Sequence, residues 1–316
     1  MAKKSQLIPG EDDPRIYADF QRLIKFKYMK NNFTLTPYDK SAGLMSGRHV
    51  SKFRGRGLNF EEFRHYQEGD DIRSMDWRVT MRTRQPYVRV YSEEKDLPVV
   101  LLVDQRKSMF FSSQDTMKSV IAAELASVCA WQVLKDTDRV GCMTFADNQH
   151  SWIAPQRSQQ NTLQIIREIE QYNRKLGALV PNQVSPSESL NHALKRLNEM
   201  KLKGALVLMF SDFKGLDEKA KAQLQAIQSA NDVLGIRISD PLEHKFKDSL
   251  EFYATDGDHQ VAVSKDSSEL ATRYKQYASL QREQLKKLFT TKSTPYIEIG
   301  TDGLHVSEFQ LAMGGK

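Results

Sequence analysis

The fold is decided by the stretch VVLLVDQRKS, residues 99–108. Its first five residues are apolar, which is typical of a strand buried on both faces of a parallel sheet. The stretch GALVLMFSD, residues 204–212, has the same character, and both apolar runs end at an aspartate. Since the carboxyl ends of parallel strands meet at one edge of a sheet, we expect Asp104 and Asp212 to lie on the same rim.

Strands and helices alternate along the chain after residue 97. Short apolar or alternating runs predict further strands at 138–146, 150–154, 232–239, 250–254, 261–263 and 296–299. Apolar residues at helical spacing predict helices at 115–134, 157–174, 188–200, 217–230 and 266–290. This alternation indicates right-handed βαβ units, and therefore an α/β fold with a doubly wound, mostly parallel sheet.

The first 96 residues have a different pattern. We expect an amphipathic helix over 13–30 that packs on the main body, and an arginine- and glycine-rich loop over 43–57. Two strands, 75–83 and 86–94, are predicted to form a hairpin. The chain is therefore divided into an N-terminal extension, 1–96, and a main domain, 97–316, which includes a C-terminal helix and strand.

The composition is that of an ordinary globular protein, with 40% hydrophobic and 27% charged residues. No apolar run approaches the roughly 20 residues of a membrane-spanning helix, and the N-terminus lacks the apolar core of a secretory signal. We expect a cytoplasmic protein in which Cys129 and Cys142 are buried, reduced thiols. The net charge of +6 lies mostly in residues 1–96, but so modest an excess argues against nucleic acid as a partner.

The polar residues expected at the rim suit two roles. Carboxylates of Asp104 and Asp212, with the hydroxyl of Ser108, are oxygen donors of the kind that Mg²⁺ prefers. In the alternative interpretation, each aspartate caps the helix that follows its strand.

The same residues resemble the metal-ion-dependent adhesion site of von Willebrand factor A domains. That site has D-x-S-x-S after the first strand, a threonine in a T-x-L-x-x-A-L-type segment, and an aspartate after a later strand. Asp104, Ser108 and Asp212 match it, but Arg106 stands for the first serine and Glu188 for the threonine. The resemblance implies a binding rim made of Asp104, Arg106, Ser108, Glu188 and Asp212.

Arg106 is the decisive departure from that site, because a guanidinium donates hydrogen bonds and cannot ligate a cation. We expect it to pair with the carboxylates and to supply internally the charge that a metal would otherwise supply. Glu188 would add a ligand instead, so a Mg²⁺ ion held by Asp104, Ser108 and Asp212 stays the alternative.

A second resemblance is carried by residues 47–104. They contain G-x-x-x-S, GRG, EF, RHY and GDDIRSMDW in the order found in the bacterial domain-of-unknown-function family fifty-eight, and the later segment ISDPLE, 238–243, agrees with it too. The resemblance implies a von Willebrand factor A-like domain and partnership with MoxR-type AAA+ ATPases, which assemble or mature protein complexes. It supplies no catalytic residue, so the protein is expected to be a non-enzymatic adaptor.

The signature region alternates acids with arginines. Its residues are Arg54, Arg56, Arg64, Asp70, Asp71, Arg73, Asp76 and Trp77. One interpretation is an ion-pair network that fastens the hairpin to the main domain. In the other, Arg54, Arg56 and Arg64 stay free to receive an acidic loop of a partner.

Two other functions stay open at this point. A metal-dependent nuclease would use clustered carboxylates beside basic residues, although arginines would neutralise them here. A nucleic-acid-binding module would use Phe53, Phe60, Phe63 and Tyr66 as stacking platforms, although such aromatics more often pack in a core. Phosphate-loop, zinc-protease and nucleophile-elbow motifs are absent from the sequence.

Overall fold

The computed structural model describes residues 13–29, 33, 35, 58–93, 97–177, 184–243, 252–255, 260–263, 268–290 and 296–315. The chain divides into two compact units, a larger one of residues 1–36 and 97–316 and a smaller one of residues 37–96. The N-terminal helix therefore belongs with the larger unit, whereas the sequence had grouped it with the extension.

The larger unit is built on a six-stranded sheet. Its strands are β3 (Pro98–Asp104), β4 (Arg139–Phe145), β5 (His150–Gln156), β6 (Leu206–Ser211), β7 (Asp232–Ile238) and β10 (Tyr296–Ile299). Across the sheet they follow the order β10-β7-β6-β3-β4-β5, and every neighbouring pair is parallel except β4 and β5. Counted from β3 this is the doubly wound order 3-2-1-4-5-6, so the predicted fold class is confirmed. The topology switches direction between β3 and β6.

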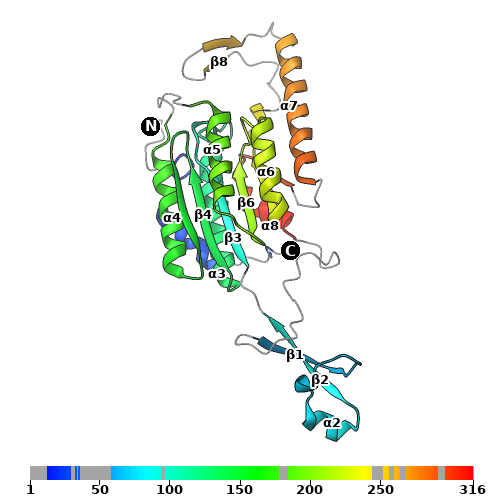
Figure 1. Ribbon diagram of the computed structural model, residues 1–316. Coiled ribbons are helices and arrows are strands. Elements are labelled where there is room, and N and C mark those ends of the chain that lie inside the picture. The colour runs from blue at the N-terminus through cyan, green and yellow to red at the C-terminus, as the bar shows by residue number, and fades with distance from the viewer. Residues whose placement is uncertain are drawn as a thin grey trace. The chain divides into compact units, whose positions relative to one another are not determined.

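Helices cover both faces of this sheet (Figure 1). They are α1 (Phe20–Lys25), α3 (Lys118–Lys135), α4 (Gln159–Arg174), α5 (Pro186–Glu199), α6 (Glu218–Ala230), α7 (Ser268–Thr290) and α8 (His305–Ala312). Alternate residues of a strand point to opposite faces. Leu101 and Val103 accordingly join one core with α1, α3, α4 and α8, and Val100 and Leu102 join a second core with α5, α6 and α7. Almost every side chain of α3 is buried.

The N-terminal helix is shorter than predicted. Residues 13–30 contain α1, capped by Asp19, whose carboxylate accepts from the backbone N of Arg22 at 2.6 Å, and a 3₁₀ turn over Phe26–Tyr28. Leu23 is fully buried, and its carbonyl accepts a hydrogen bond from Trp131 Nε1 at 3.2 Å. The expected packing of this segment on the main body is therefore confirmed.

The smaller unit departs from the prediction. Strand β1 (Leu58–His65) pairs antiparallel with β2 (Tyr87–Glu93), and between them lie a 3₁₀ turn (Ile72–Ser74) and helix α2 (Trp77–Thr83). The predicted strand at 75–83 is wrong, because the Asp76 carboxylate accepts from the backbone N of Arg78 and of Val79 and so starts a helix. The apolar residues at every second position of this stretch are also typical of a strand, which explains the wrong prediction.

The remaining elements are small. Strands β8 (Phe252–Thr255) and β9 (Gln260–Val263) pair antiparallel, and 3₁₀ turns occupy Lys107–Met109 and Pro241–Glu243. Helix α8 was not predicted, although its Phe309 is fully buried. Within the described part of the chain, no helix combines the length and the apolar character needed to cross a bilayer.

Candidate functional site

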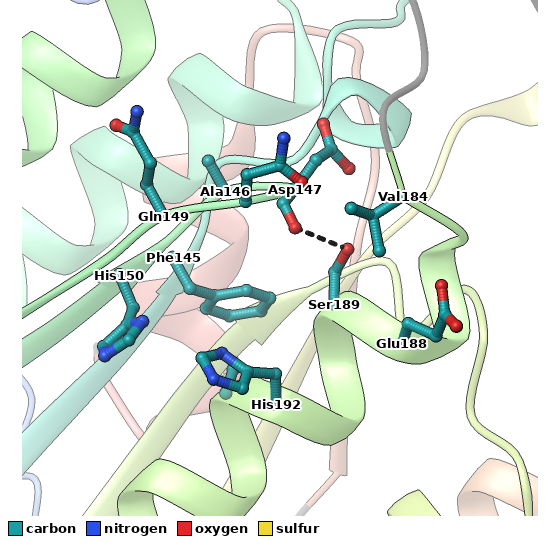
Figure 2. A pocket seen from close by; sticks show the side chains of 11 residues that line it. Phe145, Ala146, Asp147, Gln149, His150, Val184, Glu188, Ser189 and His192 are labelled. Carbon is teal, nitrogen blue, oxygen red and sulfur yellow. Dashed lines mark hydrogen bonds between the residues drawn. The ribbon is translucent and has the colours of Figure 1, made fainter.

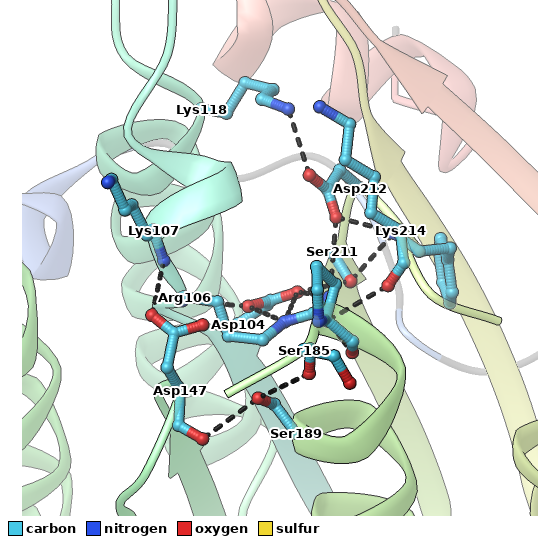
Figure 3. A network of polar contacts seen from close by, with 12 residues as sticks. Asp104, Arg106, Lys107, Lys118, Asp147, Ser185, Ser189, Ser211, Asp212 and Lys214 are labelled. Carbon is cyan, nitrogen blue, oxygen red and sulfur yellow. Dashed lines mark hydrogen bonds and ion pairs between the residues drawn. The ribbon is translucent and has the colours of Figure 1, made fainter. Parts of the chain in front are cut away.

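The topological switch brings Asp104 and Asp212 together. Asp104 is the last residue of β3, Asp212 follows β6, and these strands are neighbours in the sheet. Arg106 lies between the two carboxylates and contacts both of them (Figure 3). The rim predicted from the two apolar runs therefore exists, with both aspartates buried.

Arg106 is fully buried and uses its guanidinium group in several directions. Its Nε and a terminal nitrogen lie 3.0 Å and 2.6 Å from the two carboxylate oxygens of Asp104, and the same terminal nitrogen is 3.4 Å from Asp212. The other terminal nitrogen donates to the carbonyl of Pro186 at 2.6 Å and to that of Lys214 at 3.0 Å. Such a bidentate pair fixes the guanidinium plane, so this side chain ties β3, β6 and the start of α5 together.

A second buried cation was missed by the sequence reasoning. Lys118, at the start of α3, is fully buried, and its Nζ lies 3.0 Å from Asp212 and 2.6 Å from Glu243. Glu243 also pairs with Lys214 at 2.8 Å. The only sequence signals were a lysine beginning an otherwise apolar helical stripe and the glutamate that closes ISDPLE.

The cations decide the protonation of these carboxylates. Burial raises the pKa of Asp212, but Lys118, Lys214 and Arg106 outweigh it and leave the pKa well below its ordinary value. For Glu243, burial is likewise outweighed by Lys118 and Lys214, so its pKa is lowered. Both groups are therefore ionised at neutral pH.

Helix capping does not explain the two aspartates. One Asp104 oxygen accepts from the backbone N of Arg106 at 3.0 Å, and the other accepts from the Ser211 hydroxyl at 2.6 Å. Asp212 accepts from the backbone N of Lys214, whereas the cap of α6 is Asp217. The capping interpretation of Asp104 and Asp212 is therefore wrong.

The residues at the rim do not fit a divalent cation. Arg106 and Lys118 stand at ion-pair distance from Asp104 and Asp212, where they would repel an incoming metal. The buried Ser108 hydroxyl has no hydrogen-bond partner within the described residues, but one neutral oxygen does not offset two cations. The part of the chain that the structure describes also holds no group of three or more His, Cys, Asp or Glu residues arranged for a metal.

Glu188 stands apart from the charged cluster. It is exposed in the first turn of α5, where it forms a capping box with Ser185. The resemblance had placed it beside Asp104 as a further ligand, and the structure uses it to satisfy the start of the helix instead.

Glycine at position 215 permits the loop that carries the Lys214 carbonyl. Gly215 has φ +83°, and a Cβ there would lie 2.4 Å from the backbone N of Ser187. No other residue fits so close an approach in this conformation. The loop after β6 can therefore pack against the start of α5, and both segments present carbonyls to Arg106.

A pocket of about 380 Å³ lies beside the rim (Figure 2). Among its lining residues, Asp147 accepts from the backbone N of Lys107 at 3.0 Å, and the Phe145 ring is 5.4 Å from the guanidinium carbon of Arg106. His150 and His192 meet edge to face with centroids 5.0 Å apart. Burial, and then His192, lower the pKa of His150, while burial raises the pKa of Asp147. This pocket combines an apolar floor with ionisable walls.

Comparison with known families identifies the chain. The family model described as Protein of unknown function DUF58 matches residues 62–284. The chain belongs to the DUF58 family. The uncharacterized protein Rv1480 of Mycobacterium tuberculosis is 25% identical over 294 residues, which cover 92% of this chain and 86% of that protein.

Two solved structures are similar to parts of this DUF58 chain. The conserved hypothetical protein BatB from Bacteroides thetaiotaomicron has a TM-score of 0.39 and 10% identity, and the match covers 69% of this chain and 97% of that one. The SpRpn10 VWA domain has a TM-score of 0.34 and 14% identity, with 68% of this chain and 93% of that domain covered.

The signature residues of the DUF58 chain form local contacts in the smaller unit. Arg64 pairs with Asp70 at 2.9 Å, and Arg89 pairs with the buried Asp76 at 2.5 Å. Each of these pairs joins two residues of that unit, so it stabilises the unit itself rather than fastening it elsewhere. Since Arg64 has an acidic partner, the prediction that it stays free is wrong.

The other signature residues have separate roles. Asp71 caps the 3₁₀ turn by accepting from the backbone N of Arg73 at 2.9 Å. Trp77 is 59% exposed at the start of α2. Arg54 and Arg56 lie outside the described residues.

Proposed function

We propose that this DUF58 protein is a non-enzymatic adaptor that binds other proteins through the rim around Arg106. The observation that carries this proposal is the pairing of Arg106 with both Asp104 and Asp212. In a von Willebrand factor A-like adhesion site a metal would stand between such carboxylates. An internal guanidinium in its place makes the site a degenerate one that is formed before any partner arrives.

The pocket supports a contact role for this rim. Asp147 and Glu188 bring carboxylates to its edge, and Phe145 supplies an apolar floor. An apolar surface with a few polar groups suits recognition of a partner side chain. The buried pairs behind it hold the surface in one conformation.

The partner that the family resemblance implies is a MoxR-type AAA+ ATPase. We infer that the chain links this ATPase to protein complexes during their assembly or maturation, in the cytoplasm. The inference is supported by the family membership and by the preformed rim.

Catalysis by metal ions is not part of this proposal. A nuclease with two metals needs carboxylates that are open to the ions. Asp104 and Asp212 already engage Arg106 and Lys118. No observation on the described residues favours a nuclease or a nucleic-acid-binding module over the adaptor.

The partner is tested by affinity purification from the native cell with Gln149→Arg, which places a bulky cation at the pocket. Gln160→Arg on α4 is the matched control, because it makes the same change at an exposed site on the opposite face of the sheet. We expect an AAA+ ATPase with the unmodified chain and with the control, and loss of it with Gln149→Arg. Recovery of nucleic acid in place of an ATPase would refute the adaptor.

The internal cation is tested separately by calorimetric titration with Mg²⁺ and Mn²⁺. We expect no heat of binding, because Arg106 and Lys118 occupy the surroundings of both carboxylates. Micromolar binding that disappears in a folded Asp104→Ala variant would show that the rim holds a metal after all.

A further inference from the structure

Helix α2 presents large apolar side chains to solvent. Trp77 is 59% exposed and Met81 is 76% exposed, and as residues four apart they lie on the same face of the helix. Ile72, in the preceding 3₁₀ turn, is 60% exposed. Exposed apolar side chains of this size, gathered within ten residues, are typical of a contact surface.

This face is not needed to hold the helix in place. Asp76 caps the helix and pairs with Arg89 of β2, and the hydroxyl of Thr80 accepts from the backbone N of Tyr87 at 3.1 Å. Val79 is half-buried on the inner side. The inner side therefore anchors α2 to β2, and the outer side with Trp77 is left for another purpose.

Arginines stand beside the apolar row. Arg78 and Arg82, also four apart, are exposed, and Arg84 closes the helix in the left-handed region with φ 60°. Among the residues that the structure describes, no carboxylate lies within ion-pair distance of Arg78 or Arg82. The outer side of α2 thus has an apolar row and a cationic row next to each other.

The presence of arginine rather than lysine in this unit favours a protein partner. Residues 58–93 contain six arginines and no lysine. Protein interfaces are enriched in Trp, Met and Arg and depleted in Lys, because a planar guanidinium pairs with carboxylates while it keeps apolar contacts. Arg and Trp are also the residue types that most often dominate binding energy.

The distribution of charge argues against an extended polyanion. Residues 58–93 carry seven acids against six arginines, so this stretch has no net positive charge to attract a nucleic acid or an anionic bilayer. Residues 77–89, in contrast, contain four arginines and no acid. The face of α2 with Arg78 and Arg82 therefore has local positive charge, which suits a segment with a few carboxylates beside apolar groups.

We propose that the outer face of α2, formed by Trp77, Met81, Arg78 and Arg82, binds an acidic amphipathic helix of a partner protein. Its apolar side packs on Trp77 and Met81, and its glutamates or aspartates pair with the two arginines. This surface belongs to the smaller unit and the rim around Arg106 to the larger one, and the proposal does not depend on which ATPase, if any, the rim recognises.

The test uses the full-length chain and three synthetic peptides of equal length, measured by calorimetry. One peptide has leucines on one helical face and glutamates on the other, the second has lysines in place of the glutamates, and the third scrambles the first. We expect binding of the first alone, weakened at least tenfold by Trp77→Ala and by the double change Arg78→Glu with Arg82→Glu.

Matched controls change the same residue classes elsewhere on the surface. Leu311→Ala removes an apolar side chain that is 67% exposed on α8, and Lys195→Glu with Lys203→Glu reverses two exposed charges. These variants are expected to bind as the unmodified chain does. Tryptophan fluorescence gives a second readout, because the other two tryptophans, Trp131 and Trp152, lie in the larger unit. A blue shift on binding should therefore vanish in Trp77→Phe.

Several outcomes would overturn the proposal. They are equal binding of the lysine peptide, unchanged affinity in the Trp77 and arginine variants, and no binding at about 1 mM of the acidic peptide. Binding of anionic vesicles or single-stranded DNA that requires the same four residues would assign the face to a membrane or a nucleic acid instead.

Discussion

Arg106 of the larger unit and Arg82 of the smaller unit are the same residue type in opposite surroundings. Arg106 has no exposed surface, and its guanidinium contacts two carboxylates and two backbone carbonyls. Arg82 is exposed on a short helix, beside Met81, with no acidic partner among the described residues. Burial makes the first arginine a structural cation, whereas exposure leaves the second available to another molecule.

The comparison shows why charge alone does not locate a binding site in this chain. A cation removed from water must be paired within the protein, so its interactions are already complete. A cation that keeps its hydration can exchange water for a partner's carboxylate at small cost. The rim therefore offers a partner a surface of fixed shape, whereas the outer face of α2 offers charges that are not yet paired.

The largest expected effect is that of Arg106→Met. It leaves Asp104 and Asp212 with less compensation in a buried site, so we expect the free energy of unfolding to fall by about 3–5 kcal/mol. Arg82→Met should change it by less than about 0.5 kcal/mol, because Arg82 is exposed. Urea denaturation followed by circular dichroism measures both. Equal losses of unfolding free energy in the two variants would show that burial does not distinguish Arg106 from Arg82.

Lys118→Met should have a smaller effect, about 2 kcal/mol, because Arg106 still pairs with Asp212 and Lys214 with Glu243. Adding Glu243→Gln to this variant should restore part of the loss, since it neutralises a carboxylate that has lost one of its two cations. The same denaturation series gives the coupling between the two changes. Purely additive losses would show that Lys118 and Glu243 do not interact.

Acid should weaken the larger unit through its carboxylates. The pKa values of Asp212 and Glu243 are lowered in the folded chain, with burial opposing and the neighbouring lysines dominating. Their contribution is complete above the unfolded values near pH 4 to 4.5 and is lost as pH falls through the folded values. The urea concentration at the unfolding midpoint should therefore decrease as the pH falls below about 4.5. The decrease should be smaller in Lys118→Met. An equal drop in that variant would exclude these groups as the cause.

The smallest expected effect on stability is that of Trp77→Ala, about 0.5 kcal/mol, because the side chain is largely exposed. Replacement of Trp77 is thus expected to change binding and to leave folding intact. Thermal unfolding of the variant beside the unmodified chain measures this. A loss of several kcal/mol would mean that Trp77 is packed within the protein, and the contact surface on α2 would then be excluded.

Much of the larger unit was predictable because its strands are uninterrupted apolar runs. An aspartate ends β3 and another directly follows β6, so the sequence placed Asp104 and Asp212 on one rim and marked Arg106 as the residue that departs from a metal site. Lys118 was not predicted, because a lysine at a helix start ordinarily reaches solvent. Its burial depends on Glu243, which lies 125 positions further along the chain.

The sequence by itself determined the order of strands and helices between residues 98 and 299, since local apolar periodicity is a property of neighbouring residues. Only the tertiary structure decided how the charges are used. Residues 75–83 alternate like a strand, yet Asp76 caps a helix whose capping carboxylate also pairs with Arg89 from a later strand. That pairing joins residues 13 positions apart, and the helix it anchors turns Trp77 and Met81 outward. Pairing between distant residues follows from packing in three dimensions, which periodicity along the chain does not record.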